Sequence, residues 1–229
     1  MKIRKFLASI FFGYFLFFCA NSNLVQAGWE WENPLPQGND LHRVWGVSAN
    51  NIFAVGNAGT IIHYDGSSWS TMSSGITKEL WGLWGSSGND IFAVGEDAIV
   101  LHYNGSSWSE MSTGSFCAYC DLIDVWGSSG NDVFAVSQSG YIIHYDGIAW
   151  SEMTIGTSNG LFGVWGSASN NVFAVGRGGT ILHYDGVSWN EMANPLNGTS
   201  IDILNISGSS ENDVFAVGCD YPDTVIARF

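Results

Sequence analysis

The chain repeats one segment of about 40 residues, and this internal repeat limits the possible folds more than any other feature. The segment FAVGNAGTIIHYDGSSW begins at Phe53 and returns with small changes at Phe92, Phe134 and Phe173. A fifth copy begins at Phe215. The five phenylalanines are 39, 42, 39 and 42 residues apart. Each copy is therefore expected to form one structural unit that packs against its neighbours.

Each unit is predicted to contain four short strands. The first has the pattern L-x-x-V-W, as in Leu122–Trp126, and the second is VFAV, which is apolar on both faces and must be buried on both. The third is TIIHY, and Asp-Gly or Asn-Gly then predicts a two-residue type I′ turn, in which both residues have positive φ. The fourth carries the closing tryptophan, and no helical period appears.

Units of four strands and about 40 residues are typical of β-propeller blades. The fifth unit ends with its third strand, 223–229, whereas GWEWENPLP near the N-terminus is similar to SWNEMANPL at 188–196. The predicted fold is therefore all-β, a five-bladed β-propeller of four-stranded antiparallel blades. We expect a strand between Trp29 and Glu32 to pair with the C-terminal blade, which would close the ring and leave no open sheet edge.

The pattern WGSSGND-x-FAVG-x-x-G-T-I-x-HYDG-x-x-W resembles the repeats of propellers related to the photosystem II stability and assembly factor. It is also similar, more loosely, to the Asp-box (BNR) repeats of sialidase-type proteins. That second resemblance implies an aspartate and a glycine that shape the hairpin between the third and fourth strands, above an aromatic residue. The matching residues are Asp65, Gly66 and Trp69; Asp146, Gly147 and Trp150; and Asp185, Gly186 and Trp189, with Asn104 in place of the aspartate in the second unit.

The N-terminus has the pattern of a secretory signal peptide. Three basic residues precede an apolar run from Phe6 to Phe18, and Val25–Ala27 fits a cleavage site. We therefore predict a signal peptide at 1–27, a propeller at 28–229, and a secreted or periplasmic location. The alternatives are an uncleaved anchor, for which the apolar run is short, and a lipid anchor on Cys19.

Cleavage would leave an acidic chain. It would remove three of the seven basic residues and none of the 21 acidic ones. Such a surface repels phosphate backbones and anionic lipids, which argues against nucleic acid as a partner. No second long apolar run follows, so we expect no membrane association after cleavage, and a monomer. The remaining cations are Arg43, Lys78, Arg177 and Arg228.

Three cysteines remain after cleavage. Cys117 and Cys120 are expected to form a local disulfide in an oxidising compartment, which leaves Cys219 unpaired. A thioredoxin-like redox site needs a helix that the pattern does not show. A zinc site would need a second ligand pair.

Residues that repeat are expected to serve the blade. The HYDG histidines lie in different blades, so they cannot converge on one ion, and we expect each to bond to a neighbouring turn. The repeated tryptophans are expected in the core between blades. The sequence indicates no metal and no cofactor. The histidines are His63, His102, His144 and His183.

Residues that break the repeat are candidates for binding, although loops also vary freely. They occupy the third position of the innermost strand and the loop between the second and third strands, which we expect on one face with the connections between blades. The first group is Arg43, Gly82, Asp124, Gly163 and Asn205. The second is Asn57, Glu96, Asp97, Gln138, Arg177 and Cys219–Tyr221, which includes Asp220 and Tyr221.

These features favour a binding or scaffolding module that meets a protein or a surface glycan on the loop face. No catalytic residues are predicted. The alternative is a glycan-active hydrolase of the sialidase or glycosidase kind, which needs two carboxylates about 5 to 9.5 Å apart over the central channel. Only Asp124 stands on an inner strand; the other candidate carboxylates, Glu96, Asp97 and Asp220, are placed on loops.

Overall fold

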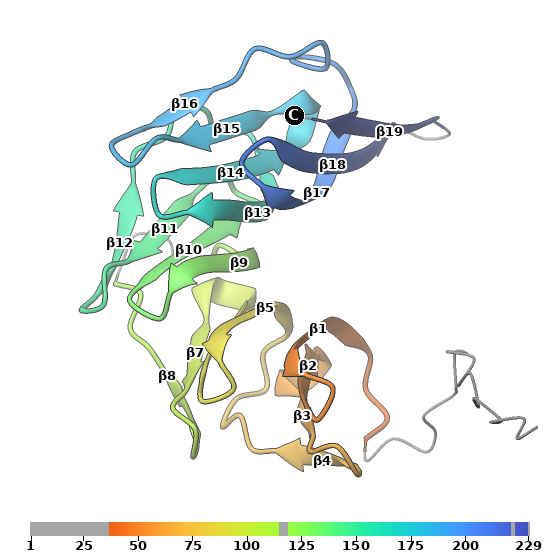
Figure 1. Cartoon of the computed structure of the whole chain (residues 1–229), viewed down its shortest axis with the longest axis vertical. Helices are drawn as coiled ribbons and strands as arrows, with labels where there is room; N and C mark the ends of the chain where they lie inside the picture. Colours follow the sequence, from red (N-terminus) through yellow and green to blue (C-terminus); the bar gives the residue numbers. More distant parts are fainter. Residues whose placement is uncertain (1–36, 115–118, 221–222, 229) are drawn as a thin grey trace, which may run out of the picture. The chain divides into compact units, whose positions relative to one another are not determined.

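The computed structural model describes residues 37–114, 119–220 and 223–228. They form five antiparallel sheets, which follow one another along the chain (Figure 1). Four sheets have four strands, and the fifth has three strands within the described residues. The predicted signal peptide and the predicted strand between Trp29 and Glu32 lie outside them. No described helix is long and apolar enough to cross a membrane.

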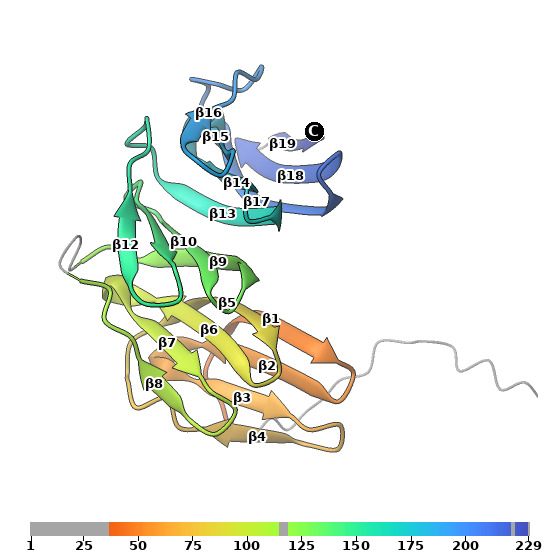
Figure 2. The ribbon, with the colours of Figure 1, turned by 60° about the vertical axis from the view of Figure 1, so that its left-hand side comes forward.

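The strands of each sheet lie in sequence order, so every connection within a sheet is a hairpin (Figure 2). We call each sheet a blade and its first strand the inner strand. The first two blades are β1 Leu41–Ser48, β2 Asn51–Gly56, β3 Ile61–Tyr64, β4 Trp69–Met72, β5 Leu80–Ser87, β6 Asp90–Gly95, β7 Val100–Tyr103 and β8 Trp108–Glu110. The next two are β9 Leu122–Ser129, β10 Asp132–Ser137, β11 Ile142–Tyr145, β12 Trp150–Met153, β13 Leu161–Ala168, β14 Asn171–Gly176, β15 Ile181–Tyr184 and β16 Trp189–Glu191. The last is β17 Asp202–Ser210, β18 Asp213–Asp220 and β19 Asp223–Arg228.

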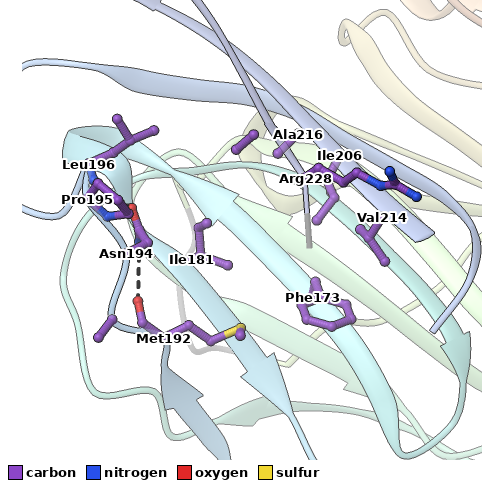
Figure 3. A pocket seen from close by; sticks show the side chains of 12 residues that line it. Phe173, Ile181, Met192, Asn194, Pro195, Leu196, Ile206, Val214, Ala216 and Arg228 are labelled. Atoms are coloured by element: carbon purple, nitrogen blue, oxygen red, sulfur yellow. Dashed lines mark hydrogen bonds between the residues drawn. The ribbon is translucent and has the colours of Figure 1, made fainter. Parts of the chain in front are cut away.

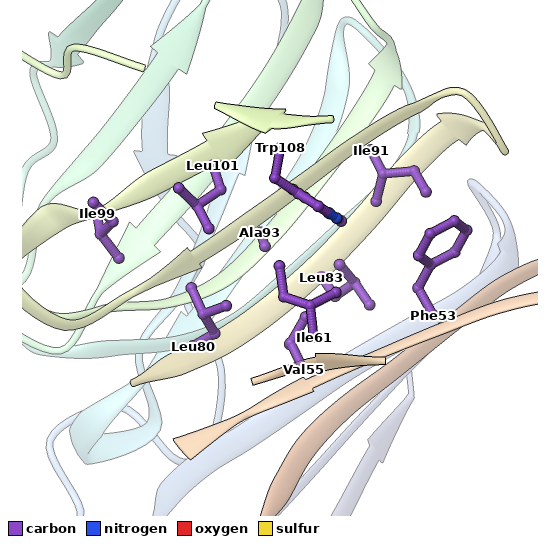
Figure 4. Close-up of a cluster of buried hydrophobic side chains, with 10 residues drawn as sticks. All are labelled: Phe53, Val55, Ile61, Leu80, Leu83, Ile91, Ala93, Ile99, Leu101 and Trp108. Atoms are coloured by element: carbon purple, nitrogen blue, oxygen red, sulfur yellow. The ribbon is translucent and has the colours of Figure 1, made fainter. Parts of the chain in front are cut away.

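Neighbouring blades share hydrophobic cores, as the doubly apolar second strand predicts. Phe53 and Val55 on β2 pack against Leu80 and Leu83 on β5, together with Trp108 from β8 (Figure 4). Phe53 is 1% exposed, and its equivalents in the next three blades are also buried. The expected position of the repeated tryptophans is confirmed for Trp108, Trp150 and Trp189, which are all buried. Stability must therefore come mainly from contacts between blades.

The repeated Trp-Gly pair has a steric reason. A Cβ added to Gly127 of β9 would lie only 2.6 Å from the ring of Trp84 on β5. Trp126 stands in the same relation to Gly166, also at 2.6 Å. Glycine thus lets the tryptophan of one blade cover the inner strand of the next.

The histidines were expected to bond to a neighbouring turn, and each bonds to the residue that directly follows a turn, the first residue of the second strand. Nε2 of His63 lies 2.7 Å from Oδ1 of Asn51, and Nε2 of His102 lies 2.6 Å from Oδ1 of Asp90. Burial lowers the pKa of His63, against the charge of Asp65, which raises it. His144 and His183 repeat the arrangement with Asp132 and Asn171.

The predicted type I′ turn is wrong. Four residues separate β3 from β4, and the left-handed residue among them is Gly66, with φ +94°. The carboxylate of Asp65 accepts the N–H groups of Ser67 and Ser68, at 2.8 and 2.9 Å. These bonds, that of Ser68 first, lower the pKa of Asp65. An aspartate that holds the turn by its side chain needs no positive φ itself.

Candidate functional site

The residues that differ most between blades lie where the inner strands bulge. The pairing of each inner strand with the next strand shifts between its first and third repeat positions, so that the second residue has no partner across the ladder. We call these five the bulge residues. They are His42, Trp81, Ile123, Phe162 and Leu204.

The bulge residues are aromatic or apolar, and they are not buried. The rings of His42 and Trp81 stack with centroids 4.3 Å apart, which joins the first blade to the second. His42 is exposed, and Leu204 is 46% exposed. The guanidinium of Arg177 lies 5.6 Å from the centroid of the Phe162 ring. Bulges often redirect side chains toward a functional site.

The loops between second and third strands lie at the same end of the blades. The amide of Asn57 donates to the carbonyl of Asp40, just before the first inner strand, at 3.0 Å. The amide of Ala98 donates to Cys120, which lies in the connection between the second and third blades, at 2.7 Å. The expectation that these loops share a face with the connections between blades is confirmed.

Two predicted candidates meet across a blade. Arg43 on β1 forms an ion pair with Oδ1 of Asp124 on β9, so the contact skips the second blade. Oδ2 of Asp124 accepts the amide of Val164 on β13, at 3.1 Å. Burial raises the pKa of Asp124, although Arg43 and the Val164 amide oppose that shift. Asp124 thus holds three blades together through its two oxygens.

The glycines among the predicted candidates make this approach possible. A Cβ on Gly82 of β5 would lie 3.0 Å from the Cα of Asp124. One on Gly163 of β13 would lie 3.2 Å from the Cα of Asn205. The alternation of glycine and polar residues is therefore a packing feature of the inner strands.

Most of the other predicted residues hold the loops. Oδ1 of Asn57 lies 2.5 Å from Nε2 of His42. Asp121 accepts the amide of Asp97 at 3.2 Å and Nε2 of Gln138 at 2.5 Å. The carboxylate of Glu96 accepts an amide at the end of the first connection, that of Glu79, at 3.3 Å. Asn57, Asp97 and Gln138 therefore shape the loop surface rather than lie free on it.

The remaining candidates are less informative. Asn205 is exposed on β17. Asp220 belongs to β18, and Tyr221 lies outside the described residues. Cys120 is disulfide-bonded. Its predicted partner, Cys117, lies outside the described part of the chain, so that pairing stays a prediction. Among the described residues, no group of three histidine, cysteine or acidic side chains could hold a metal ion.

Sequence reasoning missed His42, Trp81 and Phe162. These residues also break the repeat, and they stand directly after the first leucine of the inner strand. The same rule that selected Arg43 and Asp124 could have found them. Strand alternation alone assigns these residues to a blade interface, and a bulge changes that assignment.

Comparison with known proteins identifies the fold. No protein-family model and no curated protein match the chain. Among solved structures, YCF48 bound to D1 peptide is 16% identical, with a TM-score of 0.50 over 80% of this chain and 76% of that chain. YCF48 from Cyanidioschyzon merolae is 15% identical, with a TM-score of 0.61 over 83% and 67%. The WD40 beta propeller domain of Doa1 is 10% identical, with a TM-score of 0.64 over 79% and 63%.

These similarities show that the chain has a β-propeller fold. The predicted resemblance to photosystem II assembly factor propellers is confirmed, since YCF48 is such a factor. At these identities the likeness concerns the fold alone.

Proposed function

We propose that this protein is an exported β-propeller that binds a segment of a partner protein at the bulge residues. The observation that carries the proposal is the stacked pair His42 and Trp81, held by Asn57 at an end of the blades where the repeat is broken. The stack links the first blade to the second, but the repeated packing of the blades does not explain this pair, because the equivalent residues of the other blades differ. Residues that the repeated packing does not require are free to be selected for a ligand.

The chemistry of this surface suits a peptide. Aromatic residues and arginine are enriched at the centres of protein interfaces, and both occur here, in His42, Trp81, Phe162 and Arg177. One fold neighbour, YCF48, is described as bound to D1 peptide. We therefore favour an extended peptide over a glycan. A hydrolase has less support, because both oxygens of Asp124 are engaged by Arg43 and the Val164 amide.

We also propose that the five blades close into a ring, with a strand between Trp29 and Glu32 added to the last blade. Two exposed apolar faces support this closure. Phe215 in the last blade is 41% exposed, whereas its equivalent Phe53 is 1% exposed. In the first blade Val44 is 63% exposed, whereas its equivalent Leu83 is 4% exposed. Each face is the counterpart of one that other blades bury.

Export rests on the N-terminal pattern, and the expected disulfide of Cys120 agrees with an oxidising compartment. Cell fractionation with N-terminal sequencing of the mature protein tests this part. A cytoplasmic protein that still carries residues 1–27 would contradict this part of the proposal.

Peptide binding is tested with peptides selected from a random library on the intact protein. Trp81→Ala should weaken binding of the selected peptides at least about 10-fold, because central aromatic residues contribute about 2 kcal/mol or more. Ile148→Ala is the matched control, since Ile148 is 88% exposed on the hairpin between β11 and β12. The proposal would be rejected if both variants lost peptide binding equally. It would also be rejected if no peptide were selected and the protein bound a glycan array in a way that Trp81→Ala abolishes.

A further inference from the structure

An apolar cavity of about 290 Å³ lies between the fourth blade and the last one (Figure 3). Its walls come from the second and third strands of the fourth blade, from the segment that follows β16, and from all three strands of the last blade. The lining residues include Phe173, Ile181, Met192, Ile206, Val214 and Ala227. An engineered cavity of about 150 Å³ holds benzene, so a cavity of this size can hold an indole ring.

A tryptophan occupies the equivalent place at each of the three preceding interfaces. Trp108 meets Phe53 edge to face, with centroids 6.4 Å apart. Trp150 meets Phe92 in the same way at 6.3 Å. Trp189 meets Phe134 edge to face as well, with centroids 6.1 Å apart. In every case the tryptophan begins the fourth strand of the following blade.

The cavity walls match the surroundings of Trp189. Phe173 and Met192 are the repeat equivalents of Phe134 and Met153. The indole N–H of Trp189 lies 3.3 Å from the sulfur of Met153, so Met192 offers the same acceptor to the cavity. The walls are thus complementary to a tryptophan, because Phe173 and Met192 offer it the contacts that Phe134 and Met153 make with Trp189.

The last blade supplies additional room. Ala227 on β19 stands where the four preceding blades carry Ile62, Leu101, Ile143 and Leu182, all buried. Within the described residues this blade has three strands, ending with β19. A fourth strand could therefore pair with β19 and carry its tryptophan into the cavity.

We propose that the cavity is the binding site for the indole of Trp29, carried by a strand that pairs with β19. This proposal rests on the ring closure proposed above and identifies its central contact. In the four complete blades, the closing tryptophan precedes the first leucine or isoleucine of the next inner strand by 11, 14, 11 and 14 residues. Trp29 precedes Leu41 by 12 residues, within this range, and Trp31 precedes it by 10.

The register of the other blades predicts the remaining pairs. In the first blade Ser70 lies opposite His63, and Thr71 opposite Ile62. The same register places Glu30 opposite Arg228, and Trp31 opposite Ala227. Opposite charges at directly facing positions favour such a pairing. The residues equivalent to Trp31 are exposed, so we expect Trp31 to be exposed too; they are Thr71, Glu110, Glu152 and Glu191.

Thermal unfolding of the full mature chain tests the assignment. Trp29→Ala should lower Tm by about 6–20 °C, as expected for loss of a buried tryptophan. Trp31→Ala, the matched control in the same segment, should lower it by less than about 2 °C. Equal shifts, or the larger shift for Trp31→Ala, would overturn the assignment to Trp29.

Free indole gives a second measurement. If Trp29 fills the cavity, indole should raise Tm of Trp29→Ala by about 5–10 °C at 100 times its Kd and leave the wild type unchanged. Equal stabilisation of the wild type would mean that no side chain of the chain fills the site, and would overturn the proposal.

A cross-link tests the pairing of the strand with β19 separately from the occupant of the cavity, and it does not require Trp29→Ala to fold. In a Cys219→Ser background, Glu30→Cys with Arg228→Cys should form a disulfide within one monomer. A cross-linked dimer would identify a second copy as the donor and overturn the proposal. A monomeric cross-link with equal Tm shifts for the two tryptophan variants would retain closure and reject Trp29 as the occupant.

Discussion

The ion pair between Arg43 and Asp124 makes a strong prediction, because its two members differ in exposure. The side chain of Asp124 is 9% exposed, whereas that of Arg43 is 29% exposed. Arg43→Met would therefore leave a buried carboxylate without its countercharge, while loss of Asp124 would leave a cation that water can reach. Removing one partner of a buried pair costs about 3–5 kcal/mol. We expect about 2–4 kcal/mol for Arg43→Met at pH 7.5, since Asp124 keeps the Val164 amide.

The cost of Arg43→Met should depend on pH. Burial already raises the pKa of Asp124, and removing Arg43 raises it further. A carboxyl group whose pKa is higher in the folded than in the unfolded state is protonated in both states below the unfolded pKa, and there it does not lower the free energy of unfolding. As pH rises from the unfolded pKa through the folded pKa, the group lowers the free energy of unfolding. The deficit of Arg43→Met relative to the wild type should thus be smallest near pH 4. It should then grow by up to about 1.4 kcal/mol per pH unit before it levels off.

Urea unfolding followed by tryptophan fluorescence measures this deficit at each pH. Lys78→Met is the matched control, because Lys78 pairs with Asp97 at 3.4 Å and both side chains are more than a third exposed. Exposed pairs contribute about 0–1 kcal/mol. A deficit for Arg43→Met that is the same at every pH, or no larger than that of Lys78→Met, would refute the view that Arg43 compensates a buried charge.

Two further predictions concern the repeat itself. Asp65, Asp146 and Asp185 have lowered pKa values because each accepts two amide N–H groups of its hairpin, the later residue contributing most. Their contribution to stability is present above their unfolded pKa and is lost as pH falls through the lower folded pKa. Replacing all three with Asn should therefore reduce the fall of Tm at acid pH. An unchanged fall of Tm would contradict this. Gly127→Ala should lower the free energy of unfolding in urea by about 1–3 kcal/mol, because the new Cβ would lie 2.6 Å from Trp84. Gly156→Ala is the control, since a Cβ there meets nothing within 4 Å, and it should be neutral. Similar costs for the two variants would show that the Trp84 ring can move aside without cost.

The repeat made most of the fold predictable. A literal repeat fixes the number of units, and the two-sided apolar pattern of VFAV requires neighbours on both faces. The hairpin geometry was not predictable in the same way, because Asp-Gly alone does not say whether the aspartate uses its backbone or its side chain. In Asp65 the side chain decides, since it accepts two amides. Local competition of this kind is decided by one or two hydrogen bonds.

The candidate site was only partly predictable, for two physical reasons. The pairing of Arg43 with Asp124 depends on how closely the inner strands approach at Gly82, and the sequence marks that position only as a glycine. The bulge residues depend on a one-residue shift in the ladder, which moves a side chain out of the alternation that sequence reasoning assumes. Reasoning from the sequence could select residues that break the repeat, but it could not predict their partners.

The contacts of the variable residues bear on the proposed peptide site. Free variation in loops should leave side chains without defined partners. Here His42 is stacked on Trp81 and bonded to Asn57, and Arg177 lies over Phe162. Each contact is built from residues that no other blade repeats. At the proposed peptide site these contacts would lower the entropic cost of binding, because little side-chain freedom would remain to be lost when a peptide binds.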